Sequence, residues 1–188
     1  ITVDSQLNLQ PSLAKSWTVH EDQRITFILR DDVYFHDHAI FPNGKGRKMT
    51  AHDVVYSFNR LIDPQTASSG AWIFNDRVAT ENPFVAENDT TFTIRLQQSF
   101  QPILYLLSMP YCAIVPHEAI TTFGKNFRSN PIGTGPFKFV RWDENNLLLL
   151  HKNEHYWEQD ENGNSLPYLD GISVSFNETR AMEFLLLQ

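Results

Sequence analysis

The chain has 188 residues, of which 41% are hydrophobic, 13% aromatic and 20% charged. This length and balance fit a folded protein with its own core and exclude a disordered chain. The formal net charge is -7, and Lys and Arg are scattered singly, so no basic stripe could follow a phosphate backbone and we expect no nucleic-acid partner. No apolar run approaches the roughly 20 residues that a membrane-spanning helix needs.

Three β-hairpins are predicted along the chain. Each joins two runs of partly alternating apolar and polar residues through a short polar turn. The paired runs are 14–19 with 25–30, 84–87 with 92–96, and 137–142 with 147–152. Within the last hairpin, Leu147 to Leu150 is a continuous apolar run, which predicts a strand that is covered on both faces.

Four helices are predicted in addition to these hairpins. Thr50 is the expected N-cap of the first helix, and Asp53 is its capping-box partner. Pro102 and Pro116 suit the first turns of two short helices, and a fourth helix is expected at 178–187. The first helix has one apolar stripe at helical spacing, formed by Val54, Val55, Phe58, Leu61 and Ile62. Hairpins mixed with separate helices predict an α+β fold built on antiparallel sheet.

The segment 63–83 has weak periodicity and is predicted to be a long loop, a kind of segment that is often functional. Its Trp72 has two open interpretations, a satellite core residue or a residue that stacks on a ligand. The single cysteine, Cys112, lies in an apolar run, so we expect a buried side chain rather than a nucleophile.

The sequence His36-Asp37-His38 raises the question of a metal site, because on a strand the two imidazoles would share one face. Transition-metal sites use three or four protein ligands, and no third ligand is evident in the sequence. There is also no Gly-x-Ser-x-Gly elbow and no Gly-x-x-x-x-Gly-Lys phosphate loop. We therefore predict no catalytic residue, no metal and no cofactor.

The segment Asn130 to Phe137 contains two prolines and two glycines. Pro131 and Pro136 fix their own φ angles, while Gly133 and Gly135 are open to backbone angles that other residues avoid. This combination predicts a defined bend that leads into the strand at 137–142.

Several segments form an ordered set of motifs. They are Pro-x-Leu-Ala-x-x-Trp at 9–17, a strand-and-turn signature at 27–37, Thr-Ala-x-Asp-Val at 49–58, Pro-x-Gly-Thr-Gly-Pro-Phe at 130–137, Asn-x-x-Tyr-Trp at 153–157 and Pro-x-x-Asp at 166–170. Together they resemble family 5 of the extracytoplasmic solute-binding proteins, the peptide- and nickel-receptor family of ABC importers. The chain departs from the family at His38, where glycine is usual, and in the extended segment 39–47, so we expect an altered turn there.

The resemblance implies a receptor with two lobes that close on a solute about a hinge and perform no chemistry. It implies that residues 1–130 form a small first-lobe subdomain and 131–188 part of the adjoining sheet of a type II-like periplasmic-binding-protein fold. The second lobe is expected to be absent from this chain. The implied function is the capture of oligo- or dipeptides for an ABC transporter permease, by a monomer that is periplasmic or tethered outside the membrane as a lipoprotein.

In relatives, two regions of the first lobe face the ligand cleft. Here these regions contain Trp72 and the segment Ser108, Met109, Pro110 and Tyr111, which are the candidate ligand contacts. Simple packing of these side chains stays open as an alternative. Three other functions also stay open: a receptor for a nickel or other metal chelate or an oligosaccharide, a hydrolase with a dispersed active site, and a partner-binding domain without a small ligand.

Overall fold

The computed structural model describes residues 1–21 and 23–176. The chain forms two compact units, called unit 1 and unit 2 below. Unit 1 consists of residues 1–33 and 47–117, and unit 2 of residues 34–46 and those from 118 onward. The fourth predicted helix lies outside the described residues.

The division into units does not follow the boundary expected between residues 130 and 131. Residues 34–46 and 118–130 were expected in the first subdomain, but they pack with unit 2. Unit 2 is therefore discontinuous in sequence, since the chain enters it at 34, leaves it at 46 and returns at 118.

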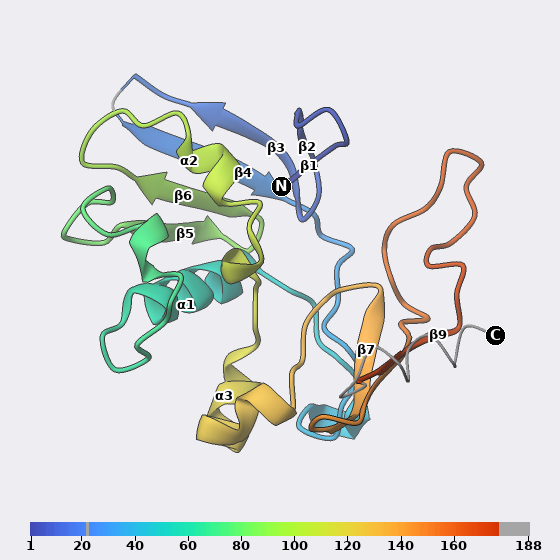
Figure 1. Ribbon diagram of the computed structural model, residues 1–188. Helices are drawn as coiled ribbons and strands as arrows, with labels where there is room; N and C mark the ends of the chain where they lie inside the picture. Colours follow the sequence, from blue (N-terminus) through green and yellow to red (C-terminus); the bar gives the residue numbers. More distant parts are fainter. Residues whose placement is uncertain (22, 177–188) are drawn as a thin grey trace. The chain divides into compact units, whose positions relative to one another are not determined.

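Unit 1 is built on a four-stranded antiparallel sheet with the strand order β3-β4-β6-β5 (Figure 1). Its strands are β3 (Ala14–Val19), β4 (Arg24–Leu29), β5 (Phe84–Asn88) and β6 (Thr91–Arg95). The two predicted hairpins are therefore present, as the pairs β3–β4 and β5–β6. A short antiparallel pair, β1 (Thr2–Val3) and β2 (Leu9–Gln10), precedes them.

The helix α1 (Ala51–Ile62) packs against β5 and β6 and closes the core of unit 1 (Figure 1). Phe58 of α1 meets Phe84 and Phe92 of the sheet at ring-centroid distances of 5.4 and 5.6 Å. Phe74 completes this aromatic cluster at 5.0 Å from Phe58 and 4.9 Å from Phe84. Edge-to-face and tilted ring pairs of this kind add to the stabilisation from apolar burial.

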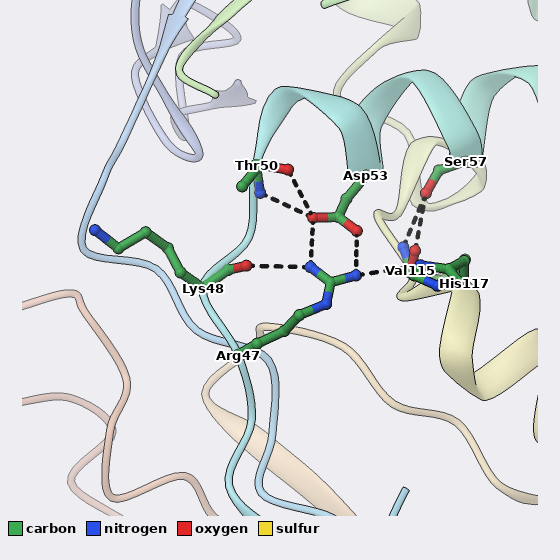
Figure 2. A network of polar contacts seen from close by, with 7 residues as sticks. All are labelled: Arg47, Lys48, Thr50, Asp53, Ser57, Val115 and His117. Atoms are coloured by element: carbon green, nitrogen blue, oxygen red, sulfur yellow. Dashed lines mark hydrogen bonds and ion pairs between the residues drawn. The ribbon is translucent and has the colours of Figure 1, made fainter. Parts of the chain in front are cut away.

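The predicted capping box at the start of α1 is present. The Asp53 carboxylate accepts hydrogen bonds from Thr50 N at 2.9 Å and Thr50 Oγ1 at 3.2 Å (Figure 2). It also accepts two hydrogen bonds from the Arg47 guanidinium, at 2.7 and 2.9 Å. One turn further on, Ser57 Oγ accepts a hydrogen bond from Val115 N at 3.0 Å and so ties α1 to the segment before α3.

The two other predicted helices within the described residues are present but short. They are α2 (Ile103–Leu106), which begins after Pro102, and α3 (His117–Phe123), which begins after Pro116. Between 1–21 and 23–176 there is no helix with the length and apolar character to cross a bilayer.

Unit 2 contains a three-stranded antiparallel sheet with the order β7-β8-β9. The strands are β7 (Phe137–Asp143), β8 (Leu147–Lys152) and β9 (Gly171–Ser175). The β7–β8 hairpin was predicted, whereas β9 was not. Leu147 to Leu150 of β8 are each only half-buried in this structure, so the prediction of a strand covered on both faces is wrong.

The predicted bend before β7 is held by hydrogen bonds from two distant residues of unit 2. Gly135 O accepts from His36 Nε2 at 2.9 Å and from Asn153 Nδ2 at 3.0 Å. The backbone also participates, since His36 N donates to Gly133 O at 2.8 Å. Neither Gly133 nor Gly135 has a positive φ angle, so the bend is fixed by its prolines and these hydrogen bonds rather than by left-handed glycines.

Candidate functional site

Trp72 and Tyr111 are large aromatic residues of unit 1 whose side chains remain substantially exposed. Trp72 is 43% exposed and Tyr111 is 44% exposed. Trp72 lies on a short 3-10 helix, η2 (Ala71–Ile73), within the predicted long loop, and Tyr111 lies on another, η3 (Pro110–Cys112). We call these two side chains the aromatic surface. Exposed aromatic rings on fixed backbone are suited to contact a ligand.

The position of Trp72 is fixed by the residues that follow it. Ile73 and Phe74 are both fully buried, and Phe74 belongs to the aromatic cluster of the core. The Trp72 carbonyl oxygen accepts a hydrogen bond from Arg77 Nη1. The same guanidinium lies over the ring of Phe100, 5.0 Å from its centroid, which links η2 to the segment that leads into α2.

The segment 108–111 is fixed by hydrogen bonds to α2. Ser108 Oγ donates to Tyr105 O at 2.7 Å, and Met109 N donates to Leu106 O at 3.1 Å. Ser108 and Met109 are half-buried, and Pro110 is exposed at the start of η3. Among the candidate residues of this segment, Tyr111 therefore offers the largest accessible side chain.

Cys112 is the buried last residue of η3, and its side chain packs next to α2. Its Sγ lies 3.7 Å from Leu106 O, and burial raises the pKa of the thiol to about 12. A thiol with so high a pKa is almost entirely protonated at neutral pH and is a poor nucleophile. The expected packing role of Cys112 is confirmed.

The segments that carry Trp72 and Tyr111 meet at Gly70. A Cβ atom at Gly70 would lie 2.7 Å from Tyr111 Cβ and Cγ, so the backbone at Gly70 lies directly against the Tyr111 side chain. The structure thus brings together two regions that are about forty residues apart in sequence and that were singled out separately. Their contact with a ligand stays a prediction.

A groove of about 320 Å³ lies in unit 2, apart from the residues predicted to contact ligand. Its walls are largely apolar and aromatic, formed by Pro136, Phe137, Tyr156, Glu158, Leu166, Pro167, Tyr168 and Leu169. The two tyrosine hydroxyls donate hydrogen bonds to carboxylates, Tyr156 to Glu158 at 2.7 Å and Tyr168 to Asp160 at 2.5 Å. These bonds fix the orientation of both rings.

The side chains of His36, Asp37 and His38 have separate partners. His36 Nε2 donates to Gly135 O, which fixes its tautomer, and Asp37 accepts from Lys45 Nζ at 2.7 Å. His38 Nδ1 accepts from Ile40 N at 3.2 Å, and its ring meets Phe123 edge-on. In residues 1–21 and 23–176, no three His, Cys, Asp or Glu side chains are grouped to hold a metal ion. The altered turn expected at His38 stays a prediction, and the structure shows that the imidazole binds the backbone two residues on.

We expect His36 to make unit 2 sensitive to acid. Burial lowers the pKa of His36, the hydrogen bond to Gly135 opposes this shift, and the charge of Lys138 adds to it. The unfolded chain has the ordinary pKa of about 6.5 and binds the proton more readily than the native state. The contribution of neutral His36 to the free energy of unfolding is therefore fully present above about pH 6.5. It is lost as the pH falls below that value toward the lowered native pKa.

The variant His36→Gln tests this pH dependence, because glutamine keeps an N–H donor for Gly135 O but does not titrate. Its stability should fall less steeply than that of the unaltered protein below pH 6.5, by up to about 1.4 kcal/mol per pH unit. Denaturant unfolding at pH 8, 6.5 and 5 measures the difference. Parallel stability curves for the two proteins over this range would contradict the prediction.

Two residues that position the aromatic surface, Gly70 and Arg77, were not identified from the sequence. Gly70 stands in Ser68-Ser69-Gly70, which is typical of any flexible loop, and Arg77 is one of many scattered cations. Their partners, Tyr111 and Phe100, lie far along the chain, so only the folded structure shows the contacts.

The model of the bacterial extracellular solute-binding proteins, family 5 (middle), matches residues 8–188. The chain belongs to this family. The family resemblance and the α+β fold predicted from the sequence are both confirmed.

The names of individual relatives report different solutes. The glutathione-binding protein GsiB of Escherichia coli K12 is 29% identical over 183 residues, which cover 95% of this chain and 32% of GsiB. The structure of NikZ from Campylobacter jejuni in complex with Ni(L-His) is 27% identical with a TM-score of 0.81, and the match covers 98% of this chain and 34% of NikZ. DppA from Helicobacter pylori in complex with the peptide STSA is 29% identical with a TM-score of 0.77, covering 95% of this chain and 36% of DppA. The chain thus spans about a third of the length of these relatives.

Proposed function

We propose that this chain is the front part of a longer solute receptor that captures peptides outside the cytoplasmic membrane and delivers them to the permease of an ABC importer. The observation that carries the proposal is the family match, which extends over residues 8–188. The relatives that it resembles include a receptor crystallised with a peptide and a receptor for glutathione, which is itself a tripeptide. The family is described as extracellular, which supports the location.

We also propose that units 1 and 2 both belong to the first lobe, and that the aromatic surface of unit 1 faces the ligand. Trp72 and Tyr111 are exposed although their elements are firmly anchored in unit 1. Rigid rings lose little conformational entropy when a ligand packs on them. They would contact the backbone and side chains of a peptide, while the charged peptide termini require groups elsewhere in the receptor.

A second candidate ligand is a metal chelate of a small amino acid, which is favoured by the likeness to NikZ in complex with Ni(L-His). The aromatic surface does not decide between the two ligands, because an imidazole ring and a peptide both pack well on Trp and Tyr. Titration of the full-length receptor with short peptides, with glutathione, and with Ni²⁺ in the presence of L-His distinguishes them.

We expect Trp72→Ala and Tyr111→Ala to weaken peptide binding by the full-length receptor about ten-fold each, because each removes a large contact made by a pre-positioned ring. Isothermal titration calorimetry measures the affinity, and thermal unfolding checks that each variant folds. Tyr34→Ala is the control, since Tyr34 is 43% exposed but belongs to unit 2. Unchanged affinity in both aromatic variants would show that these rings do not contact the ligand.

A further inference from the structure

Gly70 precedes η2 in a backbone conformation that any residue can adopt. Its φ and ψ angles are -89° and -3°, in the ordinary right-handed region. Glycine is therefore not needed for the path of the backbone at this position. The reason for glycine must instead be the space that a side chain would occupy.

That space is filled by Tyr111. A Cβ atom on residue 70 would lie 2.7 Å from Tyr111 Cβ and Cγ and 2.9 Å from Cδ1. These are the first atoms of the tyrosine side chain, and Cβ moves only with the backbone of η3. A change of rotamer at Tyr111 cannot relieve the clash, so one of the two short helices would have to shift.

Neither short helix can shift without breaking core packing or hydrogen bonds that hold it. η2 is continuous with Ile73 and Phe74, which are fully buried, and Arg77 binds its carbonyl groups. η3 is held against α2 by the buried Cys112, whose Sγ lies 3.7 Å from Leu106 O, and by the hydrogen bond from Met109 N to Leu106 O at 3.1 Å. The contact at Gly70 is therefore a close approach between two anchored elements.

We infer that Gly70 is a positioning residue for the ligand, because its missing side chain lets η2 and η3 approach and so sets where Trp72 and Tyr111 stand relative to each other. This inference rests on the proposed function, in which that surface binds peptide. Gly70 touches no ligand itself; it sets the separation of the two rings, and a wider separation would leave a peptide in contact with only one of them.

The test is Gly70→Ala in the full-length receptor, with peptide affinity and the Tm of the ligand-free protein as readouts. We expect about a ten-fold loss of affinity and a lower Tm, since the added methyl group forces η2 and η3 apart. Gly133→Ala is the matched control, because a Cβ atom there meets nothing within 4 Å and Gly133 has no positive φ angle. It should leave both readouts unchanged.

A double variant separates positioning from general damage. In the background Tyr111→Gly, which removes the atoms that clash, adding Gly70→Ala should change neither the Tm nor the remaining affinity. The inference is overturned if Gly70→Ala alone has no effect on affinity, or if its effect is equally large in the Tyr111→Gly background. Unchanged affinity in Tyr111→Gly alone overturns the proposed role of the aromatic surface instead, because that variant removes the ring itself.

Discussion

Phe74→Ala should destabilise unit 1 by about 3–5 kcal/mol, which is the usual cost of deleting a fully buried phenylalanine. Phe74 is 0% exposed, and its ring lies 5.0 Å from that of Phe58 and 4.9 Å from that of Phe84. The substitution removes these ring contacts and leaves a cavity among aromatic rings that cannot easily collapse. Since Phe74 also anchors η2, we expect weaker ligand binding along with the lower stability.

Denaturant unfolding measures this effect through the shift of the transition midpoint. Phe74→Leu keeps most of the apolar volume and should cost clearly less than Phe74→Ala. Ile28→Ala is a truncation on an exposed position of β4 and should stay within about 1 kcal/mol of the unaltered protein. A loss for Phe74→Ala as small as that for Ile28→Ala would mean that the aromatic cluster is not the core of unit 1.

Asp53→Ala should destabilise unit 1 by about 3 kcal/mol. The carboxylate is nearly buried, accepts two hydrogen bonds from Arg47 and also satisfies Thr50 N and Oγ1 (Figure 2). Its removal takes away both hydrogen bonds that Asp53 accepts from the guanidinium and leaves the Thr50 amide at the helix N-terminus without this acceptor. Arg47 retains 32% side-chain exposure, so water partly compensates the loss.

Asp31→Ala is the control for Asp53→Ala, since it also breaks an ion pair of unit 1. Asp31 lies 2.6 Å from Lys15 Nζ, but both side chains are well exposed. Surface ion pairs of this kind contribute little to stability, so Asp31→Ala should change the free energy of unfolding far less than Asp53→Ala. Equal losses for the two variants would contradict the structural role of the Asp53 carboxylate.

The features that were predicted correctly depend on residues close together in sequence. The capping box of Thr50 and Asp53 needs only three residues of spacing, and the β7–β8 hairpin needs only its two strands and their turn. The starts of α2 and α3 are marked locally by Pro102 and Pro116. Each of these signals acts within one or two turns of chain, so the sequence alone is sufficient.

The features that were missed depend on residues that fold together from a distance. Nothing near His36 indicates that it would bind the carbonyl of Gly135, 99 residues away. The burial of Ile73 and Phe74 could not be predicted either, because a loop without periodicity does not indicate which of its side chains enter the core. β9 was missed because its partner β8 lies on the far side of a long connection, so no adjacent strand and turn mark Gly171–Ser175 as half of a hairpin.

The candidate site has one part that the sequence predicted and one part that depends on distant residues. The family motifs directed attention to Trp72 and to the segment 108–111, and the structure places both in unit 1 with their aromatic rings exposed. The contact that joins them is made by Gly70, which has no side chain and therefore no signature in composition or periodicity. A contact between the backbone of one residue and a side chain about forty residues away can be found only in the folded molecule.

Native mass spectrometry of the full-length receptor, purified from its own host without refolding, tests the central claim most directly. We expect a population with added masses that match short peptides; these masses should disappear on denaturation and return when the refolded protein is given a peptide mixture. A receptor that stays free of ligand when offered peptides, or that acquires only the mass of a nickel chelate, would contradict the claim that peptides are its cargo.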